Sequence, residues 1–235
     1  MKHLTTSSLS ILIAASAFAQ SAPAKSAWSQ TSNIALSTDY VFRGVSQIAS
    51  SSAVAFSGGS DISHSSGLSL GAWFANQNFN SNDDNDTLEA DLYGAYTFKI
   101  SSADISVGVV TYNYPGASKY NTVEGNLGVA LAGASLKYSH SFTDYFGVDG
   151  SDSTGYVDLS YSYTASDLTL ALHYGWTLGA GAQDDYEDYK ISLAYPVAGY
   201  TATVAYTDAN LGAAAVYNGK QLDDAAVVFS LSKTF

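Results

Sequence analysis

The sequence contains no cysteine and only 3 prolines among 235 residues. Without cysteine there is no disulfide framework, so the fold must be stabilised by strand pairing and by burial. Positive charge is also scarce: the sequence has 9 Lys and Arg and 21 Asp and Glu, which gives a formal net charge of −12. Nucleic-acid binding requires a basic surface, and a nucleic-acid partner is therefore excluded.

Long hydrophobic runs are missing from most of the chain. After residue 19 there are no ten consecutive apolar residues, whereas a transmembrane helix needs about 20. Before that point, Lys2 precedes an apolar run at 9–19, and Ala17 and Ala19 form a small-x-small cleavage site. This pattern predicts a secretory signal peptide at 1–19. A short periplasmic segment at 20–30 and a single domain at 31–235 follow, although a later cleavage near Ala24 also fits.

The remaining chain is rich in segments in which apolar and polar residues alternate. In the clearest one, Val157, Leu159 and Tyr161 alternate with Asp158 and Ser160. A two-residue period is typical of strands with one apolar face, and tilted strands need roughly 9–11 residues to cross a bilayer. Twelve segments are expected at about 31–43, 51–60, 67–76, 87–98, 103–114, 121–131, 134–143, 154–164, 167–177, 187–195, 199–207 and the chain end.

The connections between these segments alternate between short and long. Short ones are expected at 61–66, 99–102, 132–133, 165–166 and 196–198, and longer ones at 44–50, 76–86, 115–120, 144–153, 178–186 and 208–224. Membrane barrels have short periplasmic turns and longer external loops. The sequence therefore predicts an all-β fold, a transmembrane antiparallel β-barrel of about 12 strands, with 10 to 14 as the bounds. A soluble periplasmic β-sandwich is the alternative, but it has no reason to keep this order.

Aromatic residues on the apolar faces gather near the strand ends. Aliphatic residues such as Leu92, Leu127 and Val204 occupy the middles. The aromatic set is Tyr40, Phe42, Phe98, Phe142, Tyr163, Tyr174, Trp176, Tyr195, Tyr200 and Tyr206. This distribution is typical of the aromatic girdles at a membrane interface. It predicts outer-membrane lipid as a partner and the cell outer membrane as the location, without identifying any subunit partner.

Residues 37–47 read STDYVFRGVSQ, and the chain ends on the aromatic Phe235. This segment resembles the opening of the TorF family of outer-membrane porins, which have a signal peptide, a β-barrel and a terminal aromatic residue. The resemblance is strongest over these eleven residues. It implies a pore and does not imply a known substrate.

Ten ionisable side chains fall on the polar faces and are candidates for lining a pore. The acids are Asp39, Glu89, Asp91, Glu124, Asp158 and Asp188, and the other candidates are Arg43, Lys137, Lys190 and His173. Excess carboxylates favour cations, so we expect a narrow, water-filled channel for ions or small hydrophilic solutes with a weak cation preference. Asp39 and Arg43 are four residues apart and are candidates for an ion pair across the first hairpin. Alternatively, the charges pair between strands and fill the interior.

Enzymatic chemistry has little support in the sequence. His173 is the one histidine on a polar face, and no serine lies in a nucleophile motif. The acidic stretches at 82–86 and 149–152 resemble parts of calcium loops but lack the full spacing and the terminal glutamate. We therefore expect no catalytic residue, cofactor or resident metal. The alternative to a porin is a non-conducting outer-membrane barrel that acts as an adhesin or receptor through its acidic external loops.

Overall fold

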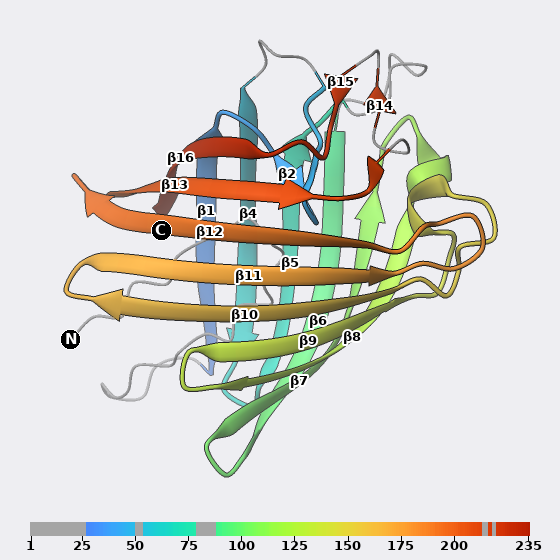
Figure 1. The fold of residues 1–235 in the computed structure, drawn as a ribbon. Coiled ribbons are helices and arrows are strands. Elements are labelled where there is room, and N and C mark those ends of the chain that lie inside the picture. The colour runs from blue at the N-terminus through green and yellow to red at the C-terminus, as the bar shows by residue number, and fades with distance from the viewer. Residues whose placement is uncertain (1–26, 50–53, 79–87, 213–215, 218–219) are drawn as a thin grey trace.

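Twelve antiparallel strands close into a barrel in which β1 pairs with β16 (Figure 1). The computed structural model describes residues 27–49, 54–78, 88–212, 216–217 and 220–235. The barrel strands are β1 (Trp28–Ser37), β4 (Ala55–His64), β5 (Leu68–Asn76), β6 (Leu88–Ile100), β7 (Ala103–Asn113), β8 (Thr122–Leu131), β9 (Ala134–Ser141), β10 (Gly155–Ala165), β11 (Leu168–Leu178), β12 (Tyr186–Val197), β13 (Tyr200–Ala209) and β16 (Ala226–Thr234). The predicted barrel is thus confirmed.

Each predicted segment corresponds to one barrel strand, and the largest differences concern β1 and β4. β1 begins at Trp28, inside the segment that was expected to precede the barrel, and it ends at Ser37 instead of continuing to residue 43. β4 runs from Ala55 to His64 instead of over 51–60. The predicted signal peptide at 1–19 and the acidic stretch at 82–86 lie outside the described residues.

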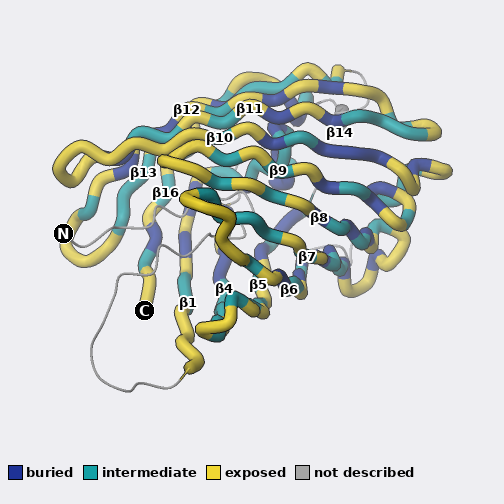
Figure 2. Tube along the Cα trace, turned by 90° about the horizontal axis from the view of Figure 1, so that it is seen from below, coloured by how far each residue is buried: buried dark blue, intermediate teal, exposed yellow. Residues whose placement is uncertain are grey.

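Apolar side chains cover the outer surface of the barrel, and polar ones point inward. Leu36, Leu92 and Leu127 are 53%, 61% and 56% exposed, although they lie within strands. Burial alternates along the strands (Figure 2) because successive side chains point to opposite faces. An exposed apolar belt of this extent is what a transmembrane barrel presents to lipid.

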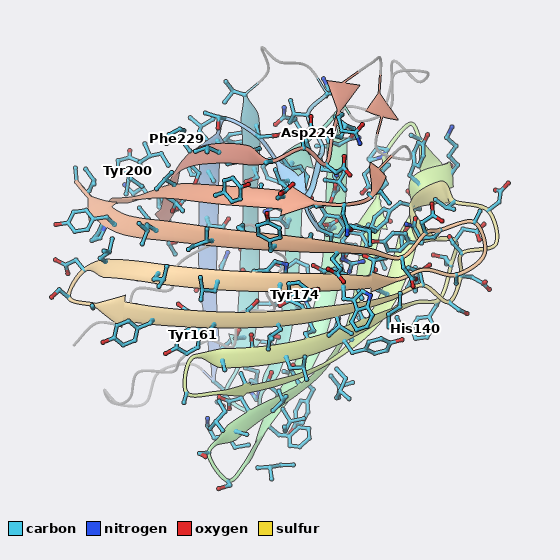
Figure 3. All side chains as sticks on the ribbon, in the orientation of Figure 1. His140, Tyr161, Tyr174, Tyr200, Asp224 and Phe229 are labelled. Atoms are coloured by element: carbon cyan, nitrogen blue, oxygen red, sulfur yellow. The ribbon has the colours of Figure 1, made fainter. Side chains whose placement is uncertain are left out.

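Most of the predicted girdle aromatics lie on this outer surface. Tyr200 and His140 lie toward opposite ends of the barrel (Figure 3). The exposed set comprises Phe98, Phe142, Tyr163, Tyr174, Trp176, Tyr195, Tyr200 and Tyr206. The assignment of Tyr40 and Phe42 to this surface is wrong, because both pack inside the barrel.

The predicted alternation of short and long connections is also confirmed. The β8–β9 turn at Ala132 and Gly133 has positive φ angles of 52° and 86°, the type I′ geometry that matches the twist of a hairpin. Trp28 pairs with His64 beside the short β4–β5 turn, so the barrel begins at the short-turn end. The short helical turns η1 (Ser118–Tyr120) and η2 (Tyr145–Gly147) lie in long connections. No helix in the described part is long and apolar enough to cross a membrane.

Replacing Leu127 by arginine tests which face of the wall meets lipid. Leu127 lies in the middle of β8 and points outward. We expect Leu127→Arg to lower the free energy of unfolding in lipid vesicles by about 2–4 kcal/mol, the cost of a cation near the bilayer midplane. The control is Ser135→Arg, on the inner face of β9. Measured by urea unfolding, this variant should lose less free energy of unfolding than Leu127→Arg. Equal costs at the two positions would contradict the assignment of the faces.

Candidate functional site in the barrel lumen

The first external connection folds back into the barrel as a small hairpin. It consists of β2 (Val41–Phe42) and β3 (Val45–Ser46), joined by Arg43 and Gly44. Both turn residues have positive φ, 46° and 78°, as a two-residue type I′ turn requires. The strand β2 is seen within the barrel in Figure 1. We call this element the lumen hairpin.

Contacts at its tip and along β3 hold the lumen hairpin in the interior of the barrel. At its tip, a Cβ atom on Gly44 would lie 2.5 Å from the Cβ atoms of both Ala209 and Asp188, so the turn is pressed against β12 and β13. On β3, the amide of Ser46 donates to the carbonyl of Leu222 at 2.7 Å. These contacts hold the hairpin between the last external connection and the barrel wall.

Aromatic packing gives the lumen hairpin an apolar core of its own. Tyr40, only 2% exposed, packs edge-on against Trp73 of β5 with ring centroids 5.4 Å apart. Phe42 contacts Tyr112 of β7 and Phe146 of η2 at 5.6 and 5.5 Å. The hydrophobic core of this protein therefore lies inside the external half of the barrel, where the hairpin and the connections meet. This is why Tyr40 and Phe42 do not face lipid.

Arg43 anchors the tip of the lumen hairpin to the far wall. Its Nη1 and Nη2 atoms donate to Oε1 and Oε2 of Glu124 on β8 at 2.8 and 2.7 Å, and Nη1 also reaches the Tyr145 hydroxyl at 3.0 Å. The guanidinium carbon lies 4.1 Å from the ring centroid of Tyr156. Bidentate, charge-assisted pairs of this kind are among the strongest hydrogen bonds in proteins.

The environment of Arg43 keeps it charged. Burial alone would lower the pKa of the Arg43 guanidinium, but the adjacent Glu124 carboxylate holds that pKa well above its usual value. The side chains of Arg43 and Glu124 are 6% and 2% exposed. The bidentate partner of Arg43 is thus Glu124 instead of the expected Asp39. Asp39 accepts a hydrogen bond from the Ser46 hydroxyl within the hairpin at 2.9 Å.

A pair of carboxylates lies behind the lumen hairpin on β6. Glu89 accepts hydrogen bonds from the hydroxyls of Tyr40 and Tyr114 at 2.9 and 3.1 Å, and Asp91 follows two residues later on the same face. Burial, and then the charge of Glu89, raises the pKa of Tyr40 well above its usual value, so its hydroxyl stays protonated and donates. These acids are covered by protein and not by open lumen.

A second charged group spans β9 to β12. His173 lies between two carboxylates, with Nε2 2.9 Å from Oδ1 of Asp188 and Nδ1 3.5 Å from Oδ1 of Asp158. Lys137 is the cross-strand partner of Asp158, and Lys190 is the cross-strand partner of His173. Acidic and basic groups are therefore interspersed along this part of the wall.

Small cavities remain around the lumen hairpin. One of about 40 Å³ lies beside Arg43, Asp158 and His173. It shares Lys190 with a cavity of about 60 Å³ along β12, β13 and β16, and it shares Lys137 with another of about 60 Å³ toward the short turns. Cavities of this size hold a few water molecules.

All ten predicted pore-lining candidates lie on the inner side of the barrel wall or on the lumen hairpin. The structure brings them together as Arg43 with Glu124, Glu89 beside Asp91, and Lys137, Asp158, His173, Asp188 and Lys190 around one cavity. Sequence reasoning missed the buried tyrosines Tyr112, Tyr145, Tyr156 and Tyr186. The two-residue period of β10 could have indicated that Tyr156 faces inward, since it alternates with the outward-facing Val157 and Leu159. Among the described residues, no three His, Asp or Glu side chains form a metal site.

Comparison with solved structures shows a shared fold at low sequence identity. The KdgM porin is similar over 87% of this chain and 98% of its own, with a TM-score of 0.57 and 10% identity. A KdgM porin in complex with disordered oligogalacturonate covers 88% and 98%, with a TM-score of 0.56 and 10% identity. The NanC porin covers 88% and 98%, with a TM-score of 0.55 and 13% identity. No curated protein sequence matches this chain.

A family model adds evidence from the sequence. It matches residues 21–235 and therefore includes every barrel strand together with the lumen hairpin. Its description is "Bacterial protein of unknown function (Gcw_chp)". The chain belongs to the Gcw_chp family.

Proposed function

We propose that this protein is an outer-membrane, porin-like channel for passive passage of small hydrophilic solutes or ions. The observation that carries the proposal is a closed ring of twelve strands with an apolar outer belt and a charged, polar interior. A wall of this kind separates lipid from a water-accessible lumen. The predicted signal peptide, the resemblance of residues 37–47 to the TorF porins and the shared fold with the KdgM and NanC porins support it.

Conductance across planar bilayers tests the proposal directly. Refolded protein is expected to give discrete current steps, and liposomes that contain it are expected to admit small uncharged solutes. A boiled sample, in which the barrel is unfolded, is the control. Folded protein that neither conducts nor admits solutes would refute the channel function.

We further propose that the channel weakly prefers cations. Six carboxylates and three Lys or Arg side chains belong to the lumen candidates, and excess acid attracts cations. The preference is expected to be small, because Glu89, Asp91 and Glu124 are buried behind the lumen hairpin and Glu124 is paired with Arg43.

The reversal potential in a potassium chloride gradient measures this preference. We expect a potential on the cation-selective side for the natural protein. Asp158→Asn removes a carboxylate that lines two cavities and should shift the potential toward zero. Asp184→Asn, in an exposed external connection, is the control. A clear anion preference in the natural protein would contradict the proposal.

A non-conducting adhesin or receptor is the second candidate function. The observation in its favour is the lumen hairpin, which fills part of the interior and lies beside cavities of about 40 and 60 Å³. In that case the acidic external loops would carry the activity. The same conductance and liposome measurements separate the two functions, since an adhesin would show neither current nor solute entry.

A further inference from the structure

His173 on β11 lies in the lumen beside the tip of the lumen hairpin. Its side chain is 9% exposed and lines the cavity of about 40 Å³ together with Arg43 and Gly44 of the turn. The neighbouring strands enclose the ring, with Asp158 on β10 and Asp188 on β12. A charge on this imidazole is therefore placed where the hairpin narrows the lumen.

The hydrogen bonds around His173 require a proton on each ring nitrogen. The Ser160 hydroxyl donates to Oδ1 of Asp158 at 2.6 Å, so it offers a lone pair to Nδ1, 3.3 Å away. The Tyr156 hydroxyl donates to Oδ2 of Asp188 at 2.9 Å, so it offers a lone pair to Nε2, 3.1 Å away. The two carboxylates beside the ring are acceptors as well. An imidazole that faces acceptors at both nitrogens donates to both only as the imidazolium cation.

The ionisable groups that face His173 come from four strands and the lumen hairpin. The cavity is lined by Asp158 and Tyr156 of β10, Asp188 and Lys190 of β12, Lys137 of β9 and Arg43 of the hairpin. Tyr112 of β7 also lines it. Both tyrosines are neutral as phenols, so the charges to be counted belong to the acids and bases.

Apart from His173, the formal charges around the cavity cancel. Lys137 and Lys190 equal Asp158 and Asp188 in number, and Arg43 is paired with Glu124 of β8. Asp39 of the hairpin lines the neighbouring cavity instead. The proton of His173 therefore decides whether this part of the lumen carries a formal charge of +1 or 0.

We propose that His173 determines the ion preference of the channel and makes that preference depend on pH. The inference rests on the proposed channel function and names the residue that tunes it. The imidazolium opposes the entry of cations, whereas the neutral ring leaves the acidic excess of the other lumen candidates in control. An ion need not touch the ring, since a charge acts over a Debye length of about 8 Å at physiological ionic strength. The cation preference is therefore weakest in acid and strengthens as the pH rises.

Reversal potentials in a potassium chloride gradient at pH 5 and pH 9.5 test this role. For the natural protein, the potassium-to-chloride permeability ratio should rise about threefold or more between these pH values, the effect of removing one charge about 6 Å from an ion in water. His173→Gln lacks the charge at every pH. This variant should show at pH 5 the ratio that the natural protein reaches only at pH 9.5, and its ratio should stay nearly constant.

His140→Gln is the matched control. His140 lies on β9 and contacts Tyr138 and Phe142, which are exposed on the outer face of the barrel. This variant should keep the full pH dependence. Where His173→Gln does not fold, the double variant His173→Gln with Asp188→Asn takes its place, because it removes one charge of each sign. Its ratio should remain at the pH 5 value of the natural protein at both pH values.

Two outcomes would overturn the role of His173 and leave the channel function intact. In the first, the natural protein conducts, but its permeability ratio is the same at pH 5 and pH 9.5. In the second, His173→Gln, or the double variant in its place, keeps the pH dependence of the natural protein. Folded natural protein that carries no current refutes the channel function itself, and the role of His173 with it.

Discussion

Arg43→Ala is expected to raise the single-channel conductance several-fold. The substitution removes both charge-assisted hydrogen bonds to Glu124 and leaves that carboxylate buried without its partner. Breaking a buried ion pair costs about 3–5 kcal/mol, which corresponds to roughly two to four orders of magnitude in the docking equilibrium of the lumen hairpin. The barrel wall is not altered, so the undocked hairpin frees the lumen.

The measurement is the distribution of current steps in planar bilayers. Lys99→Ala is the matched control, because Lys99 pairs with Asp104 at 2.6 Å but its side chain is 69% exposed. Exposed pairs contribute at most about 1 kcal/mol, so this variant should conduct like the natural protein. Glu124→Gln should reproduce the effect of Arg43→Ala. If both variants fold and their current steps are unchanged, the hairpin does not limit conduction.

Gly44→Ala is expected to prevent docking of the lumen hairpin by a different route. The added Cβ would lie 2.5 Å from the Cβ atoms of Ala209 and Asp188, which belong to packed strands. Gly44 also has a φ of 78°, which is unfavourable for residues with a side chain. We expect larger current steps and faster protease cleavage in the first external connection.

Gly199→Ala separates strain from steric overlap. Gly199 has a φ of 83° and ends the β12–β13 turn, but an added Cβ would meet no atom within 4 Å. This variant carries the same backbone cost, about 1–2 kcal/mol, without a clash. Its current steps should match those of the natural protein. If the two glycine variants behave alike, the contact of Gly44 with the wall has no role in docking.

The barrel could be predicted because its wall obeys local rules. In β10, Val157 and Leu159 face out and Asp158 faces in, and this alternation is visible without knowledge of any distant residue. The turn at Ala132 and Gly133 lies where the alternation breaks and glycine permits a positive φ. Strand number and the order of the connections follow from these signals.

The lumen hairpin could not be predicted, because periodicity does not show what covers an apolar face. Tyr40 and Phe42 continue the alternation of apolar residues that begins at Ile34 and Leu36. This alternation predicts a first strand that continues to residue 43, whereas in the structure the segment after Ser37 turns inward. The pairing of Arg43 with Glu124 joins residues 81 positions apart. The alternation of polar and apolar residues along the strands identified the charged residues of the lumen. Their hydrogen-bond partners depend on the path of the first connection, which the alternation does not show.

The closing pair of strands has a consequence for assembly. β1 pairs with β4 along its whole length, but only Asn33 to Ser37 are in register with β16. Since the partners of Asn33 to Ser37 lie at residues 230–234, this joint cannot form until the chain has been synthesised beyond residue 234. Until then the sheet is open, and its two edge strands expose unpaired amides and carbonyls, which promote aggregation. A chain that lost β16 would therefore be an open, adhesive sheet and not a smaller pore.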